Sequence, residues 1–176
     1  MTREELARAI YDVSHLTGTF TLRSGAVSNE YFDKYLFEAR PDVLKAIAEH
    51  LAELLPRDTE ILAGLEMGGI PIATALSLKT GLPGAFVRKE AKKYGTAKVA
   101  EGADLKNKKI VIVEDVVTSG GQVILSAAVL RGLEANILCA VCVIDRESGG
   151  KEKLAAEGIE LRALFTMSEL KAAANV

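Results

Sequence analysis

The sequence predicts an α/β fold in which a central parallel sheet is flanked by helices. Short apolar runs that suit buried strands alternate with longer stretches whose apolar residues recur at helical spacing. One run, Ile110–Val113, is continuously apolar and mostly β-branched, which is typical of a central parallel strand covered on both faces. Strands that alternate with helices in this way favour a sheet with helices packed against it.

Composition and charge narrow the function classes. The chain has 176 residues, 49% of them hydrophobic and 26% charged, which suits a single domain over residues 1–176. Its formal net charge is -2, so no basic field attracts nucleic acid, and we expect no such partner. The start Met1–Glu5 is no signal peptide, and no apolar run is long enough to span a bilayer. We therefore expect a cytoplasmic protein without a membrane partner.

The N-terminal third predicts a helix, a hairpin and a second helix. Thr2 and Glu5 form a capping box before a helical stretch that reaches about Leu16. Two short strands follow, on either side of a turn. A proline at a helix start and another after its last turn then bound the second helix. The predicted elements are strands Thr19–Leu22 and Tyr31–Tyr35 and a helix from Pro41 to Leu55.

The remaining elements alternate strictly. Each apolar run is followed by a loop and then a helical pattern, as in repeated βα units. The predicted strands are Ile61–Leu65, Ala85–Arg88, Ile110–Val113, Ile137–Ile144 and Glu160–Phe165. The predicted helices are Ile70–Leu78, Gln122 to about Glu134, Gly149–Glu157 and Met167–Ala174.

The segment after Ile110–Val113 predicts a phosphate site. Glu114 and Asp115 follow the strand, and Thr118–Gly121 forms a loop of small residues before the next helix. Unpaired N–H groups at a helix start attract anions, and glycines let them approach closely. The acids suit sugar hydroxyls or a Mg²⁺ beside the phosphate. An ordinary Gly-rich turn is the alternative, but two acids beside such a loop are costly unless they are used.

A basic segment follows the strand Ala85–Arg88. Its cations are Arg88, Lys89, Lys92, Lys93 and Lys98, and residues 89–102 show no periodicity. A solvated run of charge is one interpretation. The other is a mobile lid that brings cations to a pyrophosphate, and the length of the loop inside a compact domain favours it.

Two further features lie near the end of a buried strand. Cys139 and Cys142 fall inside Ile137–Ile144, where residues three apart point to opposite faces, so we expect two buried thiols and no metal site. Arg146 follows that strand, where its fork of donors would meet a ligand carboxylate. A surface pair of Asp145 with Arg146 is the alternative.

Three motifs in one order resemble the type I phosphoribosyltransferases. They are Glu114–Gln122, the run Phe86–Thr96, and Asp145–Gly150, and the match narrows to the orotate phosphoribosyltransferases. Leu22–Gly25 with Tyr31–Asp33 also fits. The resemblance covers nearly the whole chain. It implies a type I phosphoribosyltransferase fold with a small N-terminal hood, formed mainly by about residues 1–36, and a mobile lid at about 89–102.

The resemblance implies transfer of the phosphoribosyl group of phosphoribosyl pyrophosphate (PRPP) to orotate, giving orotidine 5′-monophosphate and pyrophosphate in pyrimidine biosynthesis. It implies Mg²⁺ as cofactor, held mainly by substrate oxygens and water rather than by protein ligands. It also implies a homodimer whose lid acts across the interface. A purine phosphoribosyltransferase and a non-catalytic PRPP-binding regulator are the alternatives.

The resemblance also assigns residues. The expected catalytic residues are Lys92, Asp115 and Glu114. Tyr31 and Phe32 are expected near the base, with a plain core role as an equal alternative. Some family members carry a lysine where Gly68 stands, so any contact from that loop must come from main chain here. The PRPP-binding set is Arg23, Arg88, Lys89, Lys92, Tyr94, Glu114, Asp115, Val116, Val117, Thr118, Ser119, Gly120, Gly121 and Gln122; the orotate-binding set is Thr118, Arg146, Tyr31 and Phe32.

Overall fold

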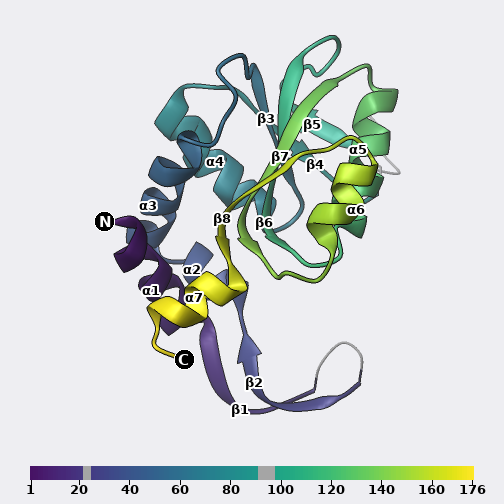
Figure 1. The fold of residues 1–176 in the computed structure, drawn as a ribbon. Coiled ribbons are helices and arrows are strands. Elements are labelled where there is room, and N and C mark those ends of the chain that lie inside the picture. Colours follow the sequence, from purple (N-terminus) through teal and green to yellow (C-terminus); the bar gives the residue numbers. More distant parts are fainter. Residues whose placement is uncertain (22–24, 91–97) are drawn as a thin grey trace.

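A six-stranded sheet forms the centre of the computed structural model, which describes residues 1–21, 25–90 and 98–176. The strand order is β5-β4-β3-β6-β7-β8, and every pair is parallel except β4 with β5 (Figure 1). The five strands predicted for this sheet are confirmed as β3, β4, β6, β7 and β8. The strands are β3 (Ile61–Leu65), β4 (Gly84–Val87), β5 (Ala100–Gly102), β6 (Lys109–Val117), β7 (Asn136–Asp145) and β8 (Leu161–Thr166).

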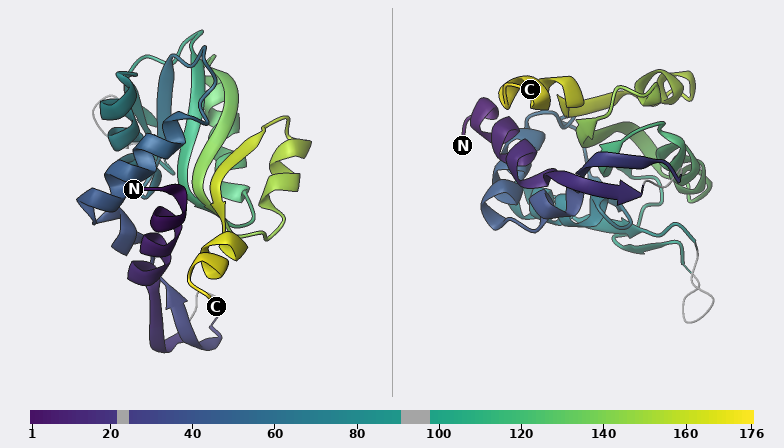
Figure 2. Two further views of the ribbon diagram at one scale, coloured as in Figure 1. Left: turned by 60° about the vertical axis from the view of Figure 1, so that its left-hand side comes forward. Right: turned by 90° about the horizontal axis from the view of Figure 1, so that it is seen from below.

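Helices cover both faces of this sheet. On one side lie α3 (Pro41–Ala52) and α4 (Gly69–Thr80), and on the other α5 (Gly121–Gly132) and α6 (Gly150–Ala156) (Figures 1 and 2). The central strands are buried on both faces, as continuous apolar runs require: Ile110 and Ile112 of β6 point into one cluster, Val111 and Val113 into the other. The sheet is therefore a rigid support for the residues at the carboxyl ends of its strands.

A hairpin projects beyond that edge. It pairs β1 (His15–Thr21) with β2 (Val27–Phe32) in antiparallel register (Figure 1). The predicted strand Tyr31–Tyr35 is wrong in its second half. Asp33 instead caps α2 (Lys34–Glu38), because its carboxylate accepts a hydrogen bond from the Tyr35 N–H at 3.1 Å. The chain thus turns from hairpin to helix immediately beside the sheet.

The two ends of the chain meet on one side of the molecule. The predicted capping box of Thr2 and Glu5 is confirmed at the start of α1 (Arg3–Ser14), which ends two residues before Leu16. α1 packs beside α7 (Met167–Ala173), and the Arg3 guanidinium donates to the Leu164 carbonyl at 2.8 Å (Figures 1 and 2). Within residues 1–36, α1 therefore belongs to the body of the protein, and the hairpin is the part that projects.

Two other segments differ from the prediction. β6 continues to Val117, so Glu114 and Asp115 lie within the strand rather than after it. The last three residues of the basic segment form β5, whose Ala100 pairs with Val87 of β4. A strand this short gives no alternation that a sequence pattern can reveal.

The predicted burial of Cys139 and Cys142 is confirmed, and both thiols are free. Over the described residues, no helix is long and apolar enough to cross a membrane.

Candidate active site

The end of β6 and the start of α5 enclose a small cavity of about 150 Å³. Its lining consists of Glu114 and the continuous run from Val116 to Val123. Thr118, Ser119 and Gly121 are exposed, and no side chain caps α5, so the first N–H groups of a twelve-residue helix face this cavity. Together with the two hydroxyls, these N–H groups form a site for an anion of phosphate size.

Glycines are required for this loop to close. Gly120 adopts φ 75°, a left-handed conformation that residues with a side chain rarely take. Gly150, at the start of α6, packs so closely that a Cβ there would lie 2.6 Å from the Thr118 carbonyl oxygen. The loop is thus held from behind by α6, which fixes the direction of its amides.

The two acids of β6 point to opposite sides of the strand. Glu114 lines the cavity at α5, whereas Asp115 points toward α2 and the loop before α4. Glu114 is 8% exposed and Asp115 is fully buried. Carboxylates are rarely buried unless a partner compensates them, so the surroundings of Asp115 decide what it can do.

Two partners of Asp115 lie on α2, a helix that the sequence analysis did not predict. The Lys34 ammonium lies 2.5 Å from Asp115 Oδ2, and the buried Glu38 stands one helical turn further on the same face. A Cβ at Gly68 would overlap the Asp115 carboxylate and lie 3.0 Å from Glu38 Oε1, so only glycine fits there. The i, i+4 spacing of Lys34 and Glu38, with Asp33 as a cap, is the signal that could have revealed this helix.

Charge is shared unequally within this cluster. Burial, with hydrogen bonding to Asp115, raises the pKa of Glu38 and of Glu114 to about 9. Burial also acts to raise the pKa of Asp115, but hydrogen bonds from Glu114 and Glu38 and the Lys34 ammonium outweigh it, so this pKa is lowered. Asp115 is therefore the ionised member, flanked by two neutral carboxylic acids and one cation.

A second cavity, of about 290 Å³, lies between the hairpin and the end of β7. Three of the four predicted orotate residues, Tyr31, Phe32 and Arg146, line it together. The Arg146 N–H donates to the Val117 carbonyl at 2.8 Å, which fixes Arg146 next to the phosphate loop. Phe32 also packs against the core, and Tyr31 contacts the Phe20 ring. The fourth residue, Thr118, lines the smaller cavity instead.

The predicted pyrophosphate cations are only partly described. Arg88 is half-buried, and its backbone N–H donates to the Val99 carbonyl at 2.8 Å. The Nε atom of its guanidinium has no hydrogen-bond partner among the described residues. Lys89 is exposed beside it. The other three predicted residues, Arg23, Lys92 and Tyr94, lie outside the described residues.

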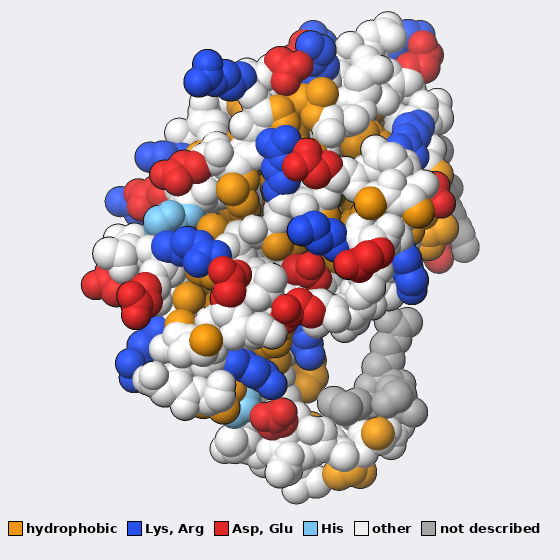
Figure 3. All heavy atoms as spheres, viewed as in Figure 1, with side chains coloured by type: hydrophobic (Ala, Val, Ile, Leu, Met, Phe, Trp, Pro, Cys, Tyr) orange, Lys and Arg blue, Asp and Glu red, His pale blue; other side chains and the backbone are white. Residues whose placement is uncertain are grey.

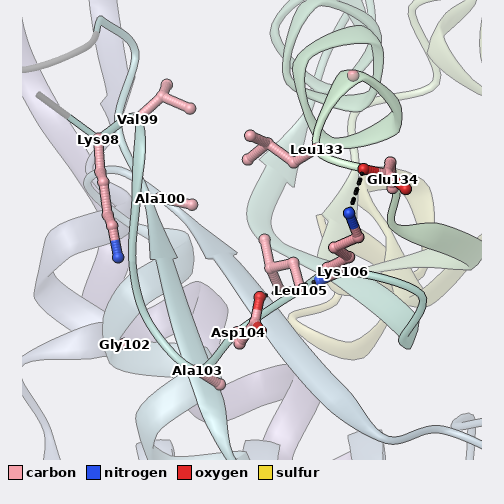
Figure 4. A pocket seen from close by; sticks show the side chains of 11 residues that line it. Lys98, Val99, Ala100, Gly102, Ala103, Asp104, Leu105, Lys106, Leu133 and Glu134 are labelled. Carbon is pink, nitrogen blue, oxygen red and sulfur yellow. Dashed lines mark hydrogen bonds and ion pairs between the residues drawn. The ribbon is translucent and has the colours of Figure 1, made fainter.

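A further cavity, of about 750 Å³, contains no residue of the predicted PRPP-binding or orotate-binding set, although Lys98 of the basic segment lines it. It lies beside β5 and the end of α5, where Leu105 and Leu133 form its apolar wall and Lys106 pairs with Glu134 at 2.9 Å (Figure 4). On the face seen in Figure 3, Lys and Arg side chains alternate with Asp and Glu, so that face carries no continuous basic surface. Through the described ranges, no three His, Cys, Asp or Glu side chains form a metal-binding group.

Comparison with known proteins points to one family. The phosphoribosyl transferase domain family matches residues 37–162. An orotate phosphoribosyltransferase of Nocardioides sp. is 49% identical over 168 residues, covering 96% of this chain and 94% of its own length. The orotate phosphoribosyltransferase of Methanocella arvoryzae is 45% identical and covers 87% of each chain.

Solved structures agree. The orotate phosphoribosyltransferase of Mycobacterium tuberculosis, in its complex with Fe(III) dicitrate, superposes with a TM-score of 0.88 at 27% identity, over 96% of this chain and 98% of its own. The same protein in complex with PRPP gives 0.83 at 25% identity, over 96% and 98% of the two chains. Adenine phosphoribosyltransferase of Leishmania donovani, at 17% identity and a TM-score of 0.73, over 96% of this chain and 81% of its own, shares the fold.

Proposed function

This chain belongs to the orotate phosphoribosyltransferase family, and we propose that it transfers the phosphoribosyl group of PRPP to orotate at the carboxyl edge of its sheet. One observation carries the location: an uncapped helix start and two buried acids share the end of a single strand, β6. Open α/β sheets bind their ligands at this edge. A phosphate loop with acids beside it suits a phosphorylated sugar better than a free base or a nucleic acid.

The 5′-phosphate of PRPP binds at the start of α5. The amides from Val117 to Gly121 donate to it, with the Thr118 and Ser119 hydroxyls, and Val116 and Gln122 complete the walls. The support for this assignment is the 150 Å³ cavity with its exposed small residues.

Glu114 and Asp115 hold the ribose hydroxyls. An ionised Asp115 accepts a hydroxyl hydrogen, whereas Glu114, with its raised pKa, can donate or accept. The transition state is oxocarbenium-like, so the protein supplies no nucleophile; these acids position the sugar while pyrophosphate departs. Holding the two substrates in the correct orientation lowers the activation barrier by several kcal/mol, on the order of what is found for well-oriented intramolecular reactions.

Orotate binds between the hairpin and β7. Arg146 pairs with its carboxylate, Tyr31 and Phe32 contact its ring, and Thr118 lies between base and sugar. Adenine and hypoxanthine have no carboxylate for Arg146, which favours orotate over a purine.

Pyrophosphate is stabilised by cations on and beside the lid. Arg88 precedes the lid segment in the sequence, Lys89, Lys92 and Tyr94 belong to it, and Arg23 is assigned to the same group. The unpartnered Nε of Arg88 supports this role. Each oriented cation of this kind is typically worth about 10²–10³ in rate.

Mg²⁺ would be required with PRPP, and we assign it no dedicated protein ligands. The pyrophosphate and ribose oxygens and water would hold it, and the hard oxygen chemistry of the site suits this ion. When bound, it would neutralise charge on the leaving pyrophosphate.

We also infer a homodimer in which each lid acts on its partner's site. Large apolar side chains are exposed on α2, α4 and β4 and in the loop before α4, which supports a protein contact there. They are Tyr35, Leu36, Met67, Leu78 and Phe86. The free thiols fit a reducing compartment, and we place the enzyme in the cytoplasm.

A direct assay tests the proposal. Purified protein is mixed with orotate, PRPP and Mg²⁺, and orotate loss is followed by ultraviolet absorbance. Orotate should be consumed and pyrophosphate released in equal amounts, with adenine, guanine and hypoxanthine inactive. Consumption of a purine in place of orotate would contradict the base assignment, and no turnover with any base would favour a PRPP-binding regulator.

A further inference from the structure

The ion pair between Lys34 and Asp115 has no role in the function proposed above. Asp115 is the most deeply buried acidic side chain in the described part of the chain, at 0% exposure. Its Oδ1 accepts the Val116 N–H at 2.6 Å, and its Oδ2 faces the Lys34 ammonium at 2.5 Å. A carboxylate without water stays ionised only if nearby groups replace its hydration.

Lys34 is the cation that does so. Glu38 on α2 also faces Asp115, and the nearby Asp33 helps to raise the pKa of Glu38. Glu114 adjoins Asp115 on β6, and the buried thiol of Cys142 interacts with it from β7. All of these groups are acidic or neutral. In the loop before α4, the backbone of Gly68 packs against the Asp115 carboxylate. Among the described residues, Lys34 alone forms an ion pair with Asp115.

The position of Lys34 connects two parts of the site. It stands two residues after Phe32, the last residue of β2 and part of the orotate cavity. Its side chain is 34% exposed, whereas Asp115 is fully buried. Lys34 therefore reaches the buried acid from the surface, at the boundary between the hairpin and the sheet. The Asp33 cap holds the first turn of α2 and therefore the direction of Lys34.

We propose that Lys34 is a positioning residue for the transfer: its ammonium keeps the Asp115 carboxylate ionised and fixed in place near the end of β6, and it ties the hairpin to the sugar site. The inference rests on the proposed role of Asp115. Without Lys34, a buried carboxylate beside two further acids takes up a proton, and a neutral Asp115 is a weaker acceptor for a ribose hydroxyl.

The test compares Lys34→Met, which keeps an unbranched stem, with Lys34→Arg, which keeps the charge. Lys45→Met, on the exposed face of α3, is the matched control. The dependence of kcat/KM for PRPP on pH is measured at saturating orotate, together with the melting temperature. Lys34→Met should raise the KM for PRPP about tenfold at pH 7, because the acidic limb of the profile moves upward past that pH. Lys34→Arg should restore the limb, and Lys45→Met should match the wild type.

Asp115→Asn and the double variant Lys34→Met/Asp115→Asn separate the two proposals. If Lys34 acts through Asp115, the double variant loses no more activity than Asp115→Asn alone. A Lys34→Met enzyme with an unshifted profile, or a double variant with additive losses, would overturn the role of Lys34. Should Asp115→Asn itself keep the wild-type KM for PRPP, the sugar-binding role of Asp115 fails instead. If Lys34→Met does not fold, Lys34→Gln is measured in the same way.

Discussion

Replacing Gly68 by alanine perturbs the acid cluster directly. The added Cβ would overlap the carboxylate of Asp115 and lie 3.0 Å from Glu38 Oε1. Because Gly69 is itself pressed against the Val113 carbonyl, the loop has little freedom to withdraw, and the Asp115 carboxylate must move instead. A shift of about 1 Å in a positioned group can cost about 10² in rate.

The expected result is a selective loss of activity. Gly68→Ala should lower kcat/KM for PRPP about 100-fold. Overpacking of this kind costs about 1–3 kcal/mol of stability, so the melting temperature should fall by several degrees while the protein stays folded. The assay is initial velocity over a PRPP titration, beside a thermal melt followed by circular dichroism.

Gly132→Ala is the control, since nothing lies within 4 Å of its Cβ position at the end of α5. It should keep full activity and lose no stability. If Gly68→Ala retained wild-type kcat/KM for PRPP, the tight packing of this loop on Asp115 would have no bearing on catalysis, and the assigned role of the acid would be refuted.

Three other predictions concern the acids, the base and the lid. Glu38 has a pKa of about 9 in the fold against a usual 4.5, so unfolding releases its proton between those values and its stabilising effect is lost as the pH rises. Glu38→Gln should therefore melt with a smaller fall in melting temperature from pH 6 to 9 than the wild type; an equal fall would show that Glu38 is not neutral. Arg146→Ala should raise the KM for orotate about 30-fold or more with little change for PRPP, because it removes a charge-assisted pair, whereas equal changes would refute the contact. Lys92→Ala should abolish most turnover at an unchanged melting temperature, and mixing it with Asp115→Asn should recover activity if the lid crosses a dimer; subunits that exchange without recovery would place the lid over its own site.

The sequence was sufficient for the parallel strands of the sheet because the central ones are buried on both faces. Runs such as Ile110–Val113 have few other places to lie, and the glycine loop after β6 has a physical reason to precede a helix. The order of the elements and the carboxyl edge therefore followed from local pattern.

What the sequence did not predict depends on contacts between distant segments. α2 has only five residues, so its cap and one i, i+4 pair are a weak signal, and the role of Lys34 depends on the fold that brings it to Asp115. β5 has three residues and exists because β4 offers it an edge. The need for glycine at position 68 likewise arises from Asp115, which is distant in the sequence.

The central claim is that the start of α5 binds the phosphate of the sugar. The most direct measurement is the backbone amide spectrum of the isotope-labelled protein during titration with ribose 5-phosphate. The largest shifts should fall on residues 117–122, with a smaller response at Glu114 and Asp115. If those amides stayed in place while others moved, or if none responded at saturating ligand, the sugar phosphate would not bind where the fold indicates.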